Sequence, residues 1–453
     1  ALSSSLTALS VALGVMLMVA VLVIFGVVRE SFNQSASGYD FVVGPKGSRL
    51  QLVLNTVFRV GAPIENLPWS FYEHLQKDRR LEEVVPFALG DVTEEGSFPI
   101  VGTTSRYFEI EYMPKKQFRI RGNRMTNAFD AVIGSQVARQ NGWDLGSEFK
   151  LIHGGAETGH VHDEKFTVVA VMAPTGTPND KTCFVNLEGF YLVEGHDKPV
   201  GEAISRERAF WGSQMPADVK QTIAEAEARL AKNPDGDSHD HSAHDHSGHD
   251  HHDHTVSDLQ KEVTALLVRA ADGSSDNETE QVRRRFGNMQ GFQAELQEGF
   301  QAQAVNPIRE IRVLMDTIVG NVFVALYGLT ILIIVVSGVG IFVSIYNSMS
   351  ERKKEIAVMR ALGARRSTVF SIILAESLLL CLVGGVLGIL LGHGLVFAAA
   401  PLVESRAGIP LDPFAFQAVE LVLLPGMIVL ATLVGFLPGI TAYRTDVASS
   451  LHS

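Results

Sequence analysis

Four long stretches without a charged side chain constrain this chain more than any other feature of its sequence. They cover residues 1–28, 317–350, 377–403 and 421–443. A helix needs about 20 apolar residues to cross the roughly 30 Å of hydrocarbon in a bilayer, and each stretch is long enough. We therefore predict a membrane protein with four transmembrane α-helices and a large α+β extracytoplasmic domain inserted between the first and the second helix.

The charged residues lie mostly between the first two apolar stretches. Residues 29–317 carry 30 of the 38 Lys and Arg and 43 of the 50 Asp and Glu, whereas residues 318–453 carry 8 and 7. An acidic block between uncharged segments excludes a wholly soluble protein. It also lacks the basic surface with which a nucleic-acid binder replaces phosphate counterions, so we expect no nucleic-acid partner.

The short loop between the second and third apolar stretches predicts the orientation of the chain. Its basic residues are Arg352, Lys353, Lys354, Arg360, Arg365 and Arg366. Short loops rich in Lys and Arg stay in the cytoplasm, so this loop and both termini are expected inside. The loop at 401–417 has Arg406 as its one basic residue and is expected outside. We expect an inner-membrane protein with one large external domain.

The first apolar stretch has an alternative interpretation as a cleaved signal peptide, with Ser35–Ser37 as the cleavage site. Its apolar region is longer than the roughly 7–15 residues usual for a signal peptide, and no basic residue precedes it. We therefore favour a transmembrane helix.

The first part of the large domain, residues 29–195, mixes the sequence patterns of helices and strands. The predicted elements are helices over 71–81 and 130–140, and strands over 84–89, 98–101, 166–172 and 182–187. Helices that alternate with strands favour an α/β or α+β layer.

The second part, residues 196–300, is interpreted as a helical insertion. Helices are predicted over 219–232 and 259–271, with a disordered loop over 236–256 between them. Eight of the sixteen residues at 239–254 are histidine. They are His239, His241, His244, His246, His249, His251, His252 and His254.

Imidazole groups at this density bind borderline transition ions such as zinc, nickel and copper, with help from neighbouring Asp carboxylates. Metal binding in vitro is therefore predicted for the His-rich loop. Its physiological role stays open, because a polar linker also tolerates such repeats. The spacing does not match a structural zinc motif, so a rigid or catalytic site is not expected there.

Histidines also gather upstream of this loop. His160 and His162 are two residues apart, and His153 precedes them. Residues i and i+2 of a strand share a face, which makes the three a second candidate ligand group. The interpretation we favour for residues 160–164 is a solvated turn.

The segments that lead into and through the membrane carry two further signals. Residues 282–317 are helix-prone and predict a stalk that Pro307 caps or kinks. Gly384, Gly388 and Gly392 recur every four residues in the third apolar stretch, which predicts a helix face where another helix approaches closely. The alternative is a flexible segment without a partner. Glu376 and the lone His393 are given no transport role.

The common catalytic motifs are missing from the sequence. The glycines of Gly44–Ser48 do not have the spacing of a nucleotide phosphate-binding loop, and neither G-x-S-x-G nor H-E-x-x-H occurs. We expect a chain that is not an enzyme, holds no intrinsic cofactor and cannot hydrolyse ATP alone.

The cytoplasmic loop resembles that of the MacB/FtsX/Lol-type permeases of ABC transporters. The matching residues are Glu351–Ile356, Arg360–Ala364, Glu376 and Gly384–Gly385. The closing segment with Pro438, Tyr443, Arg444 and Ala448–Leu451 is also similar. In the large domain, the residues that resemble a MacB-like periplasmic core are Ile100–Thr103, Tyr107, Phe108, Ile133–Ser135, Ala138, Leu145 and Gly146.

The resemblance implies a dimer of permease chains, a homodimer or a heterodimer of related permeases, bound to a dimer of cytoplasmic ATPase subunits that hold ATP and Mg²⁺. It implies that a coupling helix sits in a groove of the ATPase. The coupling residues are Glu351, Arg352, Lys353, Glu355, Ile356, Met359, Arg360, Leu362, Gly363 and Ala364. Family members of this type are thought to work by mechanotransmission, in which ATP-driven closure below rearranges the external domains.

The predicted organisation has nine parts. They are the first transmembrane helix (1–28), a MacB-like core (29–195), the helical insertion (196–300), the stalk and second transmembrane helix (301–346), the coupling segment (347–368), the third transmembrane helix (369–400), a periplasmic loop (401–417), the fourth transmembrane helix (418–443) and a cytoplasmic tail (444–453).

The expected function is to move or extract an envelope substrate, with a link to zinc and a periplasmic adaptor or substrate protein as partner. The alternative is an FtsX-like signalling subunit that activates a cell-wall hydrolase.

Overall fold

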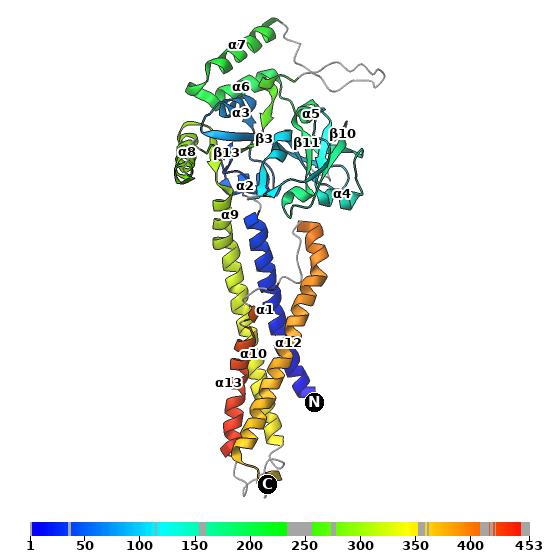
Figure 1. Cartoon of the computed structure of the whole chain (residues 1–453), viewed down its shortest axis with the longest axis vertical. Coiled ribbons are helices and arrows are strands. Elements are labelled where there is room, and N and C mark those ends of the chain that lie inside the picture. Colours follow the sequence, from blue (N-terminus) through cyan, green and yellow to red (C-terminus); the bar gives the residue numbers. More distant parts are fainter. Residues whose placement is uncertain are drawn as a thin grey trace. The chain divides into compact units, whose positions relative to one another are not determined.

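The structure is a computed structural model that forms two compact units (Figure 1). It describes residues 2–34, 38–113, 116–153, 160–232, 256–272, 278–351, 358–359, 362–407, 416, 420–421 and 423–444. The head unit is the continuous segment Ser31–Leu314, and the helical unit combines Ala1–Glu30 with Met315–Ser453. The His-rich loop, the cytoplasmic tail and most of the periplasmic loop at 401–417 lie outside the described residues.

Long apolar helices make up the helical unit. They are α1 (Leu2–Gln34), α10 (Gly320–Glu351), α12 (Arg366–Ala407) and α13 (Leu423–Arg444), with a π-helical turn at Met315–Val319 before α10. Among the described residues, the helical stretches long and apolar enough to cross a membrane are Ala8–Val27, Pro307–Asn347 and Arg366–Val403. The fourth predicted span falls on α13, whose described apolar part is shorter, so that span stays a prediction.

The head unit has an α+β fold. Its strands are β1 (Phe41–Pro45), β2 (Leu67–Pro68), β3 (Leu81–Thr93), β4 (Pro99–Thr103), β5 (Glu111–Met113), β6 (Lys116–Gln117), β7 (Ile120–Gly122), β8 (Asp130–Ile133), β9 (Glu148–His153), β10 (His160–Met172), β11 (Cys183–Asn186), β12 (Glu262–Val263), β13 (Ala265–Ala270) and β14 (Ala302–Val305). Its α-helices are α2 (Arg49–Phe58), α3 (Trp69–Gln76), α4 (Ser135–Asn141), α5 (Leu187–Leu192), α6 (Val200–Trp211), α7 (Ala217–Lys232), α8 (Glu278–Gly299) and α9 (Pro307–Leu314). Short 3₁₀ turns are η1 (Ser105–Glu109), η2 (Pro178–Lys181), η3 (Gly212–Gln214) and η4 (Asp258–Gln260).

Six strands of the main sheet close into a barrel. β3 pairs with β4, β4 with β11, β11 with β8, β8 with β10, β10 with β9, and β9 returns to β3. Side chains fill the interior of a barrel this small. Buried members of its core include Ile100, Leu151, Phe166 and Val185. Because every strand in this ring is paired on both sides, the ring has no free edge of its own.

The long strand β3 also extends the sheet beyond the barrel. Its first half pairs with β13, β13 pairs with β1, and β1 pairs with β14 at the end of the sheet. Helices α3, α6 and α8 share a core with this part, in which Phe71, Trp211 and Phe292 are buried. Figure 1 shows α8 beside β13. Burial of a Phe side chain contributes about 1.5–3 kcal/mol relative to exposure, so this core fixes α8 on the sheet.

Local signals explain where several helices begin and end. Ser48 starts α2, because its hydroxyl accepts the backbone N–H of Gln51 at 3.2 Å. Asn186 starts α5 in the same way, accepting the N–H of Glu188. Gly142 ends α4 at a φ of 68°, a left-handed conformation that glycine adopts without steric cost.

The structure confirms several predicted elements of the head and shifts others. The predicted strands over 84–89, 98–101, 166–172 and 182–187 correspond to β3, β4, β10 and β11. The helix predicted over 71–81 is α3, which ends at Gln76 because Leu81 already begins β3.

One predicted helix is wrong, and another is right only in its second half. Residues 259–271 contain β12 and β13, and β13 is a central strand of the main sheet. A buried strand is apolar on both faces, and periodicity alone does not distinguish such a run from a buried helix. Residues 130–140 divide at Gly134 into β8 and α4. The described part of residues 196–300 therefore contributes β13 to the main sheet and is not purely helical.

The predicted stalk is also interrupted. Helix α8 ends at Gly299, and β14 separates it from α9, which begins at Pro307. Proline is favoured at the first position of a helix, since its missing N–H would have no partner there. Pro307 therefore starts a new helix instead of kinking a continuous one.

Candidate functional site

The chain enters and leaves the head unit through adjacent strands. β1 is the first strand after α1, and β14 is the last strand before α9. The two strands pair antiparallel, with Val42 opposite Val305 and Val43 opposite Ala304. The segments that connect the head to the first and second apolar helices are therefore neighbours at one end of the same sheet.

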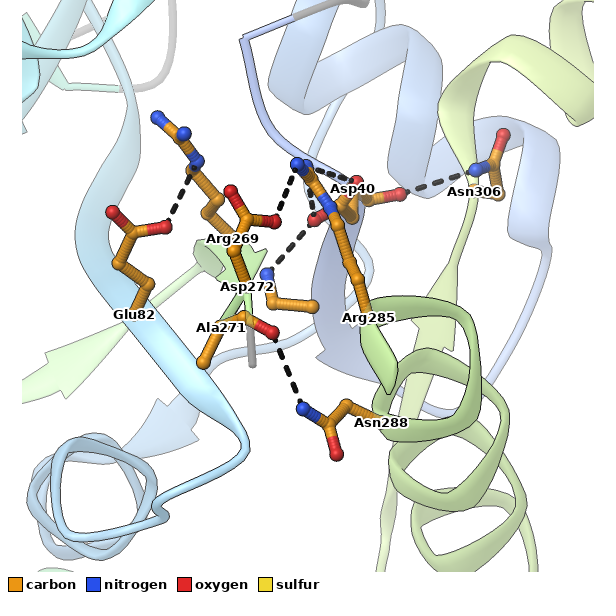
Figure 2. Close-up of polar contacts among 9 residues, drawn as sticks. Asp40, Glu82, Arg269, Ala271, Asp272, Arg285, Asn288 and Asn306 are labelled. Atoms are coloured by element: carbon orange, nitrogen blue, oxygen red, sulfur yellow. Dashed lines mark hydrogen bonds and ion pairs between the residues drawn. The ribbon is translucent and has the colours of Figure 1, made fainter. Parts of the chain in front are cut away.

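Asp40 is the centre of a polar network at this junction (Figure 2). Arg285 of α8 donates to both carboxylate oxygens of Asp40, at 2.9 and 3.0 Å. The backbone N–H of Ala270 donates to Asp40 Oδ2 at 2.8 Å, and the Asn306 side chain donates to the Asp40 carbonyl oxygen at 3.2 Å. We call Asp40, Arg285, Ala270 and Asn306 the junction clamp, because they join β1, α8, β13 and the start of α9.

Further contacts strengthen the side of the clamp formed by α8. Arg285 also pairs with Asp272 at 3.1 Å, and the Asn288 side chain donates to the Ala271 carbonyl at 3.2 Å. Figure 2 shows these contacts beside the Arg269–Glu82 pair between β13 and β3. Burial opposes the charge of Arg285, but the two aspartates outweigh this effect and raise its pKa.

A second polar cluster lies at one end of the barrel. Asp91 of β3 is directly opposite His153, the last residue of β9. His162 is on β10, and His196 lies in the segment after α5. The side chains of Asp91 and His196 are 1% and 4% exposed, whereas that of His153 is 63% exposed. We call Asp91, His153, His162 and His196 the Asp–His cluster.

Two histidines of this cluster converge on one carboxylate. His153 Nδ1 lies 2.8 Å from Asp91 Oδ1, and His196 Nε2 lies 2.9 Å from Asp91 Oδ2. Burial alone would raise the pKa of Asp91, but the two histidines outweigh burial and lower it to about 2. The hydrogen bond with Asp91 raises the pKa of His153. Asp91 is therefore a carboxylate at neutral pH, with its ligand atoms and those of His153 and His196 within 4.8 Å of one another.

The structure corrects the predicted solvated turn at residues 160–164. These residues belong to β10, and His162 is only 4% exposed. The rings of His153 and His162, which the predicted group shared with His160, lie 6.4 Å apart, whereas Asp91 and His196 were not predicted to join them. Alternation along β10 could have indicated a strand, but the sequence contains no local signal that brings residues 91 and 196 to it.

The coupling segment is described in part. Arg352, Lys353, Glu355, Ile356 and Arg360 lie outside the described residues, and Glu351 ends α10. The described apolar side chains of this segment are exposed. They are Val358, Met359 and Leu362, the last 84% exposed.

Gly363 and Ala364 complete the described part of this segment. Gly363 has a φ of 101° in the turn before α12, a conformation that favours glycine. The backbone N–H of Ala364 donates to the Met359 carbonyl at 3.0 Å.

The three predicted glycines of α12 face α1. A Cβ atom added to Gly388 would lie 2.6 Å from Val15 Cβ and 2.7 Å from the Ala12 carbonyl oxygen. Additions at Gly384 and Gly392 would lie 2.9 Å from Val11 Cβ and 2.7 Å from Val19 Cβ. Real Cβ atoms do not approach this closely, so the glycines permit the backbones of α1 and α12 to lie in contact.

His393 of α12 has a partner that the sequence analysis did not identify. Its Nε2 lies 3.0 Å from a carboxylate oxygen of Glu420, whose side chain is fully buried. The two residues are 27 positions apart, so no local pattern connects them. His393 therefore has a carboxylate partner and is not a lone histidine.

Comparison with known families decides what kind of protein carries these features. A family model described as MacB-like periplasmic core domain matches residues 4–232, which is half of the chain. A second, described as FtsX-like permease C-terminal, matches residues 327–447. The chain belongs to the MacB/FtsX family of ABC transporter permeases. The permease is thus a multi-pass membrane protein with a large external domain.

Curated relatives match parts of this permease. The macrolide export ATP-binding/permease protein MacB of Photorhabdus laumondii is 35% identical over 119 residues, which are 26% of the permease and 18% of that protein. The ABC transporter permease YknZ of Bacillus subtilis is 32% identical over 145 residues, 32% of the permease and 33% of that protein. The matched part of the permease spans no more than a third of the length of these relatives.

A solved structure is also similar to the permease. It is the periplasmic region of MacB from Actinobacillus actinomycetemcomitans, which is 10% identical with a TM-score of 0.31. The alignment covers 62% of the permease and 95% of that chain.

Proposed function

We propose that this permease is the non-catalytic membrane subunit of a MacB/Lol-type transporter in the bacterial inner membrane. A separate cytoplasmic ATPase dimer would hydrolyse ATP, and the permease, as a dimer, would convert that reaction into a rearrangement of the head. The rearranged head would move or extract an envelope substrate, with a periplasmic adaptor or substrate protein as a further partner.

The junction between the head and the apolar helices is the observation that carries this proposal. Force on a span can reach the head through the chain that joins them, and here the two joining segments lead into the paired strands β1 and β14. The junction clamp ties both to α8, so a relative displacement of the first two spans would shift the end of the main sheet. The MacB-like match of the head does not favour the alternative of a cell-wall signalling subunit.

Reversing charge in the coupling segment is expected to uncouple the ATPase. Arg352→Glu with Arg360→Glu removes two cations that the family resemblance assigns to the ATPase contact. The described residues of the same segment include the exposed Met359 and Leu362. We expect stimulated ATPase activity of the reconstituted complex to fall at least tenfold, a loss of about 1.4 kcal/mol in coupling. Turnover is measured in proteoliposomes with the co-expressed ATPase.

The matched control for this experiment changes Arg365 and Arg366 to Glu. It has the same charge change in the same loop but leaves the coupling residues intact, and it should retain most of the stimulation. Protease accessibility of the head in sealed vesicles checks that neither variant alters insertion. Equal turnover in the two double variants would contradict the proposed coupling role.

The link to zinc is proposed on the His-rich sequence at 239–254. If this loop regulates transport, its deletion should abolish any change that added zinc causes in ATPase turnover of the complex while leaving zinc-free turnover intact. A control loop of equal length, with the eight histidines replaced by serine, should behave like the deletion. An unchanged zinc response in both variants would remove the loop's regulatory role.

A further inference from the structure

The Asp–His cluster has the composition of a metal centre. Its residues come from β3, β9, β10 and the segment after α5, so they meet only because the barrel closes. A buried carboxylate is costly unless it is paired or binds a metal, and Asp91 is 1% exposed. Its two histidine neighbours could stabilise the carboxylate either with a proton or as ligands of a shared metal ion.

The tautomer of His196 identifies a position for a cation. Its Nδ1 lies 2.7 Å from the Phe190 carbonyl oxygen. A carbonyl can only accept, so Nδ1 carries the hydrogen. In the neutral ring, Nε2 then has no hydrogen and presents a lone pair. Nε2 lies 2.9 Å from Asp91 Oδ2, and these two atoms do not have the geometry of a hydrogen bond.

Two acceptors at this distance repel each other unless a positive charge lies between them. A second proton on His196 would supply that charge, and so would a metal ion. The contact with Phe190 is the arrangement that metal-ligating histidines show, in which the ring nitrogen away from the metal donates to a backbone carbonyl. Stacking on the Phe190 ring, at 4.2 Å between centroids, further fixes the orientation of His196.

The types of ligand atom in the cluster indicate which class of metal ion it would bind. Two imidazoles with one carboxylate suit zinc and its neighbours in the first transition series, whereas calcium and magnesium prefer oxygen ligands. A tetrahedral zinc site with bonds of about 2.0–2.2 Å places its ligand atoms about 3.4 Å apart. The ligand atoms of Asp91, His153 and His196 lie within 4.8 Å of one another, so small side-chain adjustments reach this spacing.

A fourth side chain lies beside these three. The ring centroid of His162 is 5.2 Å from that of His196 and 6.4 Å from that of His153. His162 is buried, whereas His153 is exposed and provides the side from which an ion enters. Structural zinc sites use four protein ligands. His162 lies outside the group of ligand atoms within 4.8 Å, so its side chain would have to move toward the other three to be the fourth ligand.

We propose that Asp91, His153, His162 and His196 form a binding site for one zinc-class divalent ion in the head of this permease. The ion would join β3 to β9 and β10, the strands at which the barrel closes, and would hold the segment after α5 against them. The site is distinct from the His-rich loop, which contributes none of its ligands. The proposal concerns metal binding and holds whether or not the transport function proposed above is right.

Zinc titration of the full chain in detergent tests the site. The starting protein has residues 239–254 deleted, so that the eight histidines of the loop do not bind the probe. After treatment with a chelator, zinc chloride is added in competition with a chromophoric chelator, and bound zinc is measured by mass spectrometry. We expect one zinc per chain, and cobalt(II) substitution should give the intense visible absorption of a tetrahedral site.

Single substitutions then assign the ligands. Asp91→Asn and His196→Gln should each weaken zinc binding by at least about tenfold. The matched controls are Asp163→Asn, an exposed carboxylate on the same hairpin, and His74→Gln, a histidine of α3. Both controls should bind zinc as the starting protein does. If the variants at buried positions do not fold, His153→Gln at the exposed position provides the same test.

Two results would overturn the proposal. One is a loop-deleted chain that binds no zinc, which would mean that a proton holds the cluster together. The other is equal zinc affinity of the Asp91→Asn and Asp163→Asn variants. His162→Gln decides the fourth ligand, since an unchanged cobalt spectrum in this variant would exclude His162 from the site.

Discussion

Gly388→Ala is expected to destabilise the helical unit by about 1–3 kcal/mol, the usual cost of inserting a methyl group into a filled contact. The new Cβ would lie 2.6 Å from Val15 Cβ and 2.7 Å from a backbone oxygen of α1, so no side-chain rotation relieves the clash. α1 and α12 must separate. Because membrane helices associate mainly through close packing, this separation also removes the contacts of the neighbouring glycines.

Cys381 provides a local probe of this effect. It is a fully buried thiol on α12, and the second cysteine, Cys183, is in the barrel of the head. In a Cys183→Ala background, heating in the presence of a thiol-reactive dye therefore reports exposure of α12 alone. Gly388→Ala should lower the labelling midpoint by several degrees.

The matched control is Gly394→Ala in the same helix. Nothing lies within 4 Å of a Cβ added at Gly394. This control should leave the midpoint unchanged or raise it slightly, since alanine favours a helix over glycine by about 1 kcal/mol. Equal midpoints for the two variants would show that α1 and α12 do not pack through Gly388.

Arg285→Ala is expected to loosen the junction clamp and to weaken coupling between the spans and the head. The substitution leaves Asp40, whose side chain is 14% exposed, without its charged partner. Loss of a hydrogen bond to a charged group costs about 1.5–3 kcal/mol. All three tryptophans, Trp69, Trp143 and Trp211, are in the head unit, so thermal unfolding followed by their fluorescence reports the head selectively.

The neighbouring Arg284→Ala is the control for the clamp. Arg284 pairs with Glu280 on the exposed side of α8, and an exposed pair contributes only about 0–1 kcal/mol. We expect Arg285→Ala to lower the Tm of the head by several degrees and to reduce transport at unchanged ATPase binding, and Arg284→Ala to do neither. A clamp variant with a lowered Tm and normal transport would mean that the network stabilises the head without transmitting movement.

The family and the packing face of α12 were both predictable from the sequence, but the partner of that face was not. The family was predictable from the motif at Glu351–Ala364, because a motif is a property of a short continuous segment. The glycines of α12 were predictable as a packing face because their spacing follows the helical repeat. Their partner α1 was not, because the sequence of α12 contains no information about which helix lies beside it.

Within the head, the sequence predicted β3, β4, β10 and β11 but not β8 and β13, whose residues are buried on both faces and show no alternation. Residues 265–270 were mistaken for helix for this reason, and with them the central place of β13 in the sheet was missed. A strand covered on both sides has no alternation, and only its pairing with β1 and β3 establishes what it is.

The sequence by itself determined the apolar spans, the acidic head between them and the family, since hydrophobic length, charge and motif spacing are properties of continuous segments. Only the tertiary structure decided the junction clamp and the Asp–His cluster. Asp40 and Arg285, like Asp91 and His196, are separated by a hundred residues or more. Such residues become neighbours only through strand pairing and helix packing, which depend on the whole chain.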